Sequence, residues 1–149
     1  MTQLLPDPDL SAEERGRYAR HLTLPEFGVS GQQRLKTASV LCVGAGGLGS
    51  PLLLYLAAAG VGRIGIVDDD CVEVSNLQRQ GLHAEGGLGE PKTGSARRRL
   101  LGLNSHCLVE EHACRLTKAN AVELIESHDV VVDGSDNFPT RYLINDVCA

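Results

Sequence analysis

The segment VGAGGLGS, residues 43–50, connects a short apolar run, Ser39–Val43, to a helix-forming stretch, Leu48–Ala59. An apolar run of this length that ends in glycines is typical of a parallel strand buried on both faces. Glycines between a strand and a helix let the backbone turn tightly beneath a phosphate group, and the N-terminus of the helix attracts its negative charge. The segment therefore predicts a strand–loop–helix unit that binds a phosphate-bearing ligand.

The same alternation of strand and helix patterns continues along the chain. Gly60 follows the first helix as a left-handed C-cap, and the second strand is predicted at Arg63–Asp68. Such alternation predicts an α/β fold with a Rossmann-like, doubly wound, mainly parallel sheet whose ligand lies at the carboxyl ends of the strands. The remaining strands are predicted at Leu108–His112 and Asp129–Asp133, and the remaining helices at Pro91–Leu103, Ala119–Ser127 and Asn137–Ala149.

Two further helices are predicted before the first strand. Ser11–Arg20 carries Ser11 as its N-cap and Glu14 as the capping-box partner, and Gly28–Lys36 follows. The 149 residues then make one nucleotide-binding domain, with an N-terminal helical arm over about 11–36 and a Rossmann-like part over about 38–149. Asn137–Ala149 stops without a glycine cap, a trailing proline or a following strand, which predicts that the domain is truncated at its C-terminus.

Composition narrows the class of protein. The net charge of −5 argues against nucleic acid or an anionic membrane as a partner, so phosphate binding has to come from local cations. The N-terminus carries no secretory signal pattern and no apolar stretch is long enough to cross a bilayer, so we expect a cytoplasmic protein. The five cysteines include no CxxC pair, which predicts free thiols and no zinc site. Cys42 is predicted to pack in the core and Cys71 to be exposed in a loop.

A second polar block follows the predicted second strand. Residues 68–70 read DDD, and residues 75–80 read SNLQRQ. The carboxylate of Asp68 suits the hydroxyls of a ribose, and the guanidinium of Arg79 is placed to reach back toward phosphate oxygens. Lys92, at the start of the next predicted helix, adds a second full positive charge. Together with the glycine loop, the block predicts a nucleoside triphosphate site.

Six separated motifs carry most of the candidate residues, and they are Arg17–Arg20, Gly44–Gly49, Asp68–Asp70, Ser75–Gln80, Gly89–Lys92 and Asp136–Asn137. In this order they resemble the MoeB/ThiF/HesA family of the ubiquitin-activating superfamily, with MoeB as the most similar branch. The resemblance implies an enzyme that uses Mg-ATP to adenylate the C-terminal Gly-Gly carboxylate of a small ubiquitin-like sulfur-carrier protein. The carrier would resemble the molybdopterin synthase small subunit, and the pathway would be molybdenum cofactor or thiamin biosynthesis.

The resemblance also implies roles for individual residues. Asp136 would hold Mg²⁺, Arg20 would act across the interface of a homodimer, and both belong with Arg79 and Lys92 to the catalytic candidates. A carboxylate nucleophile is ionised at neutral pH and pyrophosphate leaves as a metal-bound anion, so the reaction needs no general base or covalent catalyst. The candidate nucleotide-binding residues are Gly44, Gly46, Gly47, Gly49, Asp68, Ser75, Asn76, Leu77, Gln78, Arg79, Lys92, Asp136 and Asn137.

Other interpretations remain open at the level of sequence. The glycine loop and Asp68 also suit an NAD-binding dehydrogenase domain, and the family pattern also suits a non-catalytic remnant that binds ATP. Asp133 and Asp136 lie near the end of the fourth predicted strand, where two carboxylates can share a metal or one can cap the next helix. Asp69 and Asp70 are not among the candidate site residues.

Overall fold

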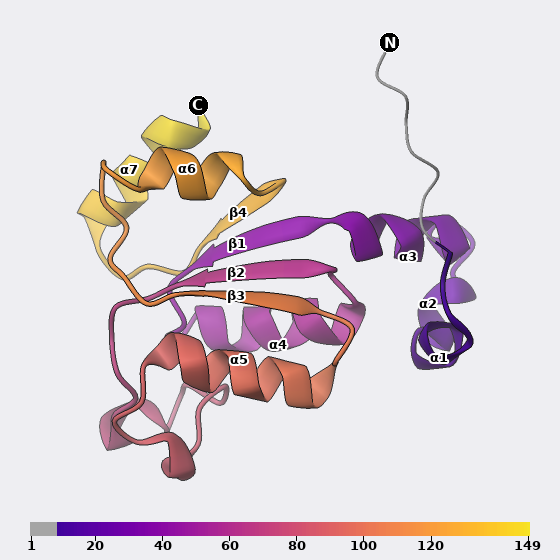
Figure 1. Ribbon diagram of the computed structural model, residues 1–149, viewed down its shortest axis with the longest axis horizontal. Helices are drawn as coiled ribbons and strands as arrows, with labels where there is room; N and C mark the ends of the chain where they lie inside the picture. The colour runs from indigo at the N-terminus through magenta and orange to yellow at the C-terminus, as the bar shows by residue number, and fades with distance from the viewer. Residues whose placement is uncertain (1–8) are drawn as a thin grey trace.

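The computed structural model describes residues 9–149 as an α/β fold built on a four-stranded parallel sheet (Figure 1). The strands are β1 (Ser39–Val43), β2 (Arg63–Val67), β3 (Leu108–His112) and β4 (Val130–Asp133), in the order β3-β2-β1-β4. Every neighbouring pair is parallel, so all four strands end at one edge of the sheet. The predicted Rossmann-like, doubly wound architecture is confirmed.

Helices cover both faces of the sheet. In Figure 1, α4 (Gly49–Ala59) and α5 (Lys92–Leu103) lie on one face, and α6 (Ala121–Glu126) and α7 (Phe138–Cys148) lie on the other. Successive residues of a strand point to opposite faces, and for this reason Cys42 packs with the first pair of helices while its neighbour Leu41 packs with the second. The two aliphatic cores are thus separated by a sheet that is buried along the whole of β1.

The N-terminal arm precedes β1 and consists of α1 (Ala12–Arg17), α2 (Ala19–Leu22) and α3 (Gly28–Thr37). The capping box of Ser11 and Glu14 is confirmed, but the single helix predicted over 11–20 is broken at Tyr18. Tyr18 is buried, and its hydroxyl accepts a hydrogen bond of 2.7 Å from the amide of Asn104, 86 residues further along the chain. The break thus coincides with a buried tertiary contact and follows Gly16, a residue that weakens a helix. Figure 1 shows the arm beside the start of β1, at the amino ends of the strands.

The long connection between β2 and α5 contains two 3₁₀ turns, η1 (Val74–Asn76) and η2 (Glu85–Gly87). Other element bounds differ from the predicted ones by one or two residues, and Gly60 ends α4 with φ of 92°, as expected for a left-handed cap. None of the helices within residues 9–149 combines the length and the apolar character that crossing a membrane requires.

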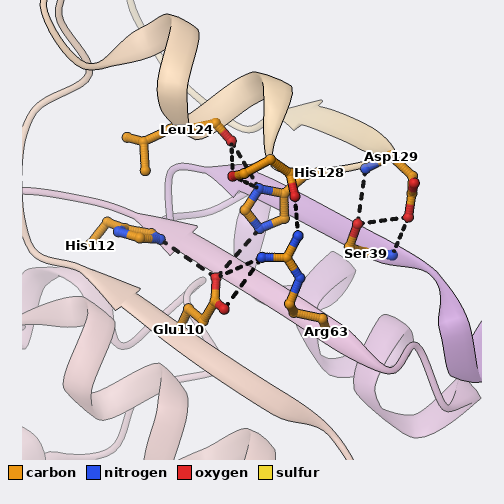
Figure 2. Close-up of polar contacts among 8 residues, drawn as sticks. Ser39, Arg63, Glu110, His112, Leu124, His128 and Asp129 are labelled. Atoms are coloured by element: carbon orange, nitrogen blue, oxygen red, sulfur yellow. Dashed lines mark hydrogen bonds and ion pairs between the residues drawn. The ribbon is translucent and has the colours of Figure 1, made fainter.

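Polar contacts join the strands at the end of the sheet that lies away from the carboxyl edge (Figure 2). Arg63 on β2 pairs with Glu110 on β3 at 3.2 Å, and the Glu110 carboxylate lies 3.8 Å from Nε2 of the buried His128. The Asp129 carboxylate accepts hydrogen bonds from the Ser39 backbone N–H at 2.8 Å and from its hydroxyl at 2.7 Å. These contacts connect the strands near their amino ends. The residues at the carboxyl ends of the strands form the candidate site.

Candidate functional site

A cavity of about 920 Å³ opens at the carboxyl edge of the sheet. Val43 and Val67, the last residues of β1 and β2, form its floor together with Gly134, which follows β4. Segments far apart in the sequence meet here because parallel strands end on the same side. Residues of the predicted site that line the cavity are Gly44, Gly46, Gly47, Asp68, Asn76, Arg79, Lys92, Asp136 and Asn137.

The glycine loop between β1 and α4 packs closely against the loop after β4. Gly44 has φ of 100°, and a Cβ added there would lie 2.7 Å from the carbonyl oxygen of Gly134. A Cβ on Gly49 would lie 1.9 Å from the carbonyl oxygen of Gly44, so both positions require glycine. In the first turn of α4, the Ser50 N–H is bonded to the Gly46 carbonyl at 2.9 Å and Pro51 has no N–H, so an anion would meet the amides of the glycine loop in front of the helix.

Asp68 anchors the loop to the end of β2. Its Oδ2 accepts a hydrogen bond of 2.8 Å from the N–H of Ala45, and its Oδ1 accepts one of 2.8 Å from the N–H of Asp70. Each carboxylate oxygen has a further lone pair, so the side chain can still accept bonds from the hydroxyls of a sugar. Asp68 is therefore both a structural and a candidate ligand-binding residue.

Two cations from different elements line the same cavity as the glycine loop. Lys92 is the first residue of α5; its side chain is 6% exposed and its ammonium lies 3.0 Å from the carboxylate of Asp70. Arg79 donates a hydrogen bond of 3.2 Å to the carbonyl of Ser75, and its Cδ and Nε would lie 3.8 Å from a Cβ on Gly47. Both positive groups thus belong to the cavity that the glycine loop lines, where they would attract an anion.

The loop after β4 distinguishes the roles of Asp133 and Asp136. Asp133 accepts hydrogen bonds from the N–H of Ser135 at 2.9 Å and from its hydroxyl at 2.6 Å. Neither carboxylate caps α7, because the side chain of Asn137 accepts the capping bond from the N–H of Thr140 at 3.0 Å. Asp136 is exposed and lines the cavity, where its oxygens suit a hard cation such as Mg²⁺.

The sequence model of the ThiF family matches residues 18–149. The chain belongs to the ThiF family. It is 55% identical over 141 residues to the probable adenylyltransferase/sulfurtransferase MoeZ of Mycobacterium tuberculosis, covering 95% of this chain and 36% of that protein. It is 58% identical over 134 residues to the sulfur carrier protein adenylyltransferase of Thermus thermophilus, covering 90% of this chain and 49% of that protein. The chain thus spans between about a third and a half of the length of these curated relatives.

The fold is also similar to solved structures. The crystal structure of the E. coli tRNA N6-threonylcarbamoyladenosine dehydratase TcdA in complex with ATP matches with a TM-score of 0.89 and 26% sequence identity. The match covers 95% of the ThiF-family chain and 58% of the TcdA chain. The predicted family is confirmed, and its curated relatives include an adenylyltransferase/sulfurtransferase and a sulfur carrier protein adenylyltransferase.

Some predicted residues of this ThiF-family chain lie outside the cavity. Ser75, Leu77 and Gln78 belong to the turn that carries Asn76 and Arg79, and the Ser75 hydroxyl donates to the carboxylate of Glu73 at 3.3 Å. Gly49 supports the loop from behind, where it contacts the Gly44 carbonyl. Arg20 is exposed on α2, in the arm at the amino ends of the strands, and does not reach the cavity of its own chain.

The cavity also contains residues that are not among the predicted site residues. Gln80 is 3% exposed and lines it, and in the sequence this residue ends the SNLQRQ motif. Arg115 follows the carboxyl end of β3, and Arg141 donates a hydrogen bond of 3.0 Å to the carbonyl of Ser135. A polar residue just after a parallel strand is the signal that could have found Arg115. Arg141 has no local signal, because only the folded loop after β4 brings it to the site.

The cavity of the ThiF-family chain has acidic donors besides Asp136. The carboxylate oxygens of Asp68, Asp69 and Asp70 lie within 4.8 Å of one another, close enough to share one cation. Cys42 is buried in β1 as predicted, and burial, with the nearby Asp68 and Asp133, raises the pKa of its thiol to about 12. Such a thiol is not a nucleophile at neutral pH. Cys71 is exposed, as predicted.

Proposed function

We propose that this chain forms the nucleotide-binding part of an ATP-dependent adenylyltransferase that activates the C-terminal Gly-Gly carboxylate of a small ubiquitin-like sulfur-carrier protein. The proposal rests on one observation: the glycine loop, Asp68, Arg79, Lys92 and Asp136 come from separate segments and line a single cavity. The names of the curated relatives support this activity. The carrier we propose is like the molybdopterin synthase small subunit, and the pathway is molybdenum cofactor or thiamin biosynthesis.

The geometry suits transfer of AMP to a carboxylate. The carrier carboxylate would attack the α-phosphorus of ATP, forming an acyl–phosphate bond as the bond to pyrophosphate breaks. The amides of the glycine loop in front of α4 would hold the phosphates, and Asp68 would bind the ribose hydroxyls. Arg79 and Lys92 would offset the charge that develops on the oxygens of the leaving pyrophosphate.

Magnesium fits the donor set of this cavity. Asp136 would hold the ion, and the oxygens of residues 68–70 lie at the same cavity. When bound, Mg²⁺ neutralises phosphate charge and so favours departure of pyrophosphate. The carboxylate nucleophile needs no general base, so the chain itself would contribute only positioning and charge stabilisation by its cations and amides.

Arg20 would complete the site from a second copy of the chain. It lies on the arm at the amino ends of the strands, whereas the cavity lies at their carboxyl ends. Its side chain is exposed and therefore accessible to a neighbouring subunit. We propose a homodimer in which each Arg20 serves the partner's cavity. The five free cysteines suit a reducing, cytoplasmic setting.

The test is ATP–pyrophosphate exchange with a purified carrier protein. Exchange is expected only with a carrier that has its terminal glycine, and Lys92→Ala should abolish most of it while the protein stays folded. Binding of Mg-ATP without exchange would identify a non-catalytic nucleotide-binding chain. Stronger thermal stabilisation by NAD than by Mg-ATP would contradict the proposal and favour a dehydrogenase domain.

A further inference from the structure

His83 lies beneath the glycine loop and is not part of the cavity lining. It belongs to the connection between η1 and η2 and is 7% exposed. Its Nε2 lies 2.8 Å from the carbonyl oxygen of Ala45, and its Nδ1 lies 2.9 Å from the hydroxyl of Ser95 on α5. One buried imidazole therefore joins the glycine loop to the helix that begins with Lys92.

These contacts define the tautomer of His83. A carbonyl oxygen can only accept a hydrogen bond, so Nε2 carries the proton and donates it to Ala45, while Nδ1 accepts from the Ser95 hydroxyl. Burial, helped by the nearby Lys92 ammonium, lowers the pKa of His83 although the bond to Ala45 opposes this. The neutral imidazole is consequently the form that fits the fold.

The bond from His83 determines how one loop peptide is oriented. The carbonyl of Ala45 and the N–H of Gly46 belong to the same planar trans peptide, so they point in opposite directions. Holding the carbonyl toward His83 turns the Gly46 N–H away from it, and Gly46 lines the cavity. Ala45 is held on its other side too, where its own N–H donates to Asp68 at 2.8 Å.

We propose that His83 is a positioning residue that orients the Ala45–Gly46 peptide toward the cavity and ties this loop to the start of α5. Ser95 lies three residues after Lys92, so the same imidazole couples the loop amides to a cation of the site. That the oriented amide serves a phosphate rests on the function proposed above. The orientation itself is a property of the ligand-free chain and can be measured without ATP.

The first test compares His83→Gln with His83→Asn by amide hydrogen exchange. The amide nitrogen of glutamine can take the place of Nε2 and still donate to Ala45, whereas that of asparagine reaches only the place of Nδ1. The readouts are the N–H groups of Ala45 and Ser50, which are bonded to Asp68 and to the carbonyl of Gly46. We expect His83→Asn to speed their exchange by about tenfold or more, and His83→Gln by less than about twofold.

The matched control is Tyr18→Phe, which removes a buried hydrogen bond to Asn104 in the N-terminal arm. It should lower global stability without changing exchange at Ala45 and Ser50. Equal exchange in the two His83 variants, or no change in His83→Asn, would reduce His83 to a packing residue. The same conclusion would apply if Tyr18→Phe sped loop exchange as much as His83→Asn does.

The second test measures the Kd for Mg-ATP by calorimetry. His83→Asn should raise the Kd for Mg-ATP by about tenfold, whereas the Kd of His83→Gln should stay within about twofold of the wild-type value. Suppose that the wild type binds no Mg-ATP while the two His83 variants differ in amide hydrogen exchange as expected. The proposed function then fails and the positioning role stands. If both variants bind Mg-ATP like the wild type, the positioning role fails and the proposed function stands.

Discussion

Gly44→Ala should unfold the chain more easily because Gly44 has no room for a side chain. A residue other than glycine in the left-handed region costs about 1–2 kcal/mol, and Gly44 has φ of 100°. The new Cβ would lie 2.7 Å from the Gly134 carbonyl oxygen, a backbone atom that has to move together with its strand. Adding about 1–2 kcal/mol for this overlap gives a total of about 3 kcal/mol.

A loss of about 3 kcal/mol lowers the Tm of a chain of this size by about 6–12 °C. Circular dichroism during thermal and urea unfolding measures the change. Gly102→Ala is the matched control, because Gly102 lies within α5 and nothing lies within 4 Å of the added Cβ. The control should gain about 0.5–1 kcal/mol from helix propensity. A loss below about 1 kcal/mol in Gly44→Ala would refute the argument that the two loops are in fixed contact.

Three further predictions concern charge. Lys92→Ala should lower ATP–pyrophosphate exchange by about a hundredfold through the loss of a buried cation at the phosphates, and a loss below about threefold would remove Lys92 from the site. Arg20→Ala should leave the Tm unchanged and lower ATP–pyrophosphate exchange. A mixture of the Arg20→Ala and Lys92→Ala chains should restore about a quarter of wild-type exchange activity. Half of the dimers in the mixture contain one chain of each kind, and each of these has one intact site out of two. Failure of the mixture to regain activity would exclude action across the interface. Because the pKa of His83 is lower in the folded chain than in the unfolded chain, the unfolded chain binds a proton at His83 at a higher pH than the folded chain does. The free energy of unfolding should therefore fall as pH drops below about 6.5. His83→Gln should weaken this dependence in urea titrations at several pH values, and an unchanged slope would contradict it.

The strands and the glycine loop were predictable because their signals are local. The predicted strand Ser39–Val43 matches β1, which ends at the glycine loop in the structure, and the predicted strand Leu108–His112 matches β3. The break at Tyr18 coincides with a buried hydrogen bond to Asn104 across 86 residues, a contact that local sequence patterns do not reveal. The sequence predicts that Asn137 binds the nucleotide; in the structure its side chain caps α7.

The candidate site was predictable to the extent that it lies directly after strands. Asp68 and Asp136 follow β2 and β4, and the parallel sheet brings them to one cavity with the glycine loop. The pairing of Lys92 with Asp70 depends on how the connection between β2 and α5 folds back, which periodicity does not describe. The same reason explains why Arg141 was missed, because its bond to Ser135 forms only once α7 is placed.

The central place of β1 in the sheet has a consequence for how far apart the two ends of a bound ligand can be. Its neighbours β2 and β4 each lie one strand spacing away, so the segments that carry Asp68 and Asp136 are separated by about 10 Å across the sheet. Main-chain pairing along three strands maintains this width. The segments that would bind the sugar and the terminal phosphate of a nucleotide are therefore held at a separation that the sheet sets, whether or not a ligand is bound.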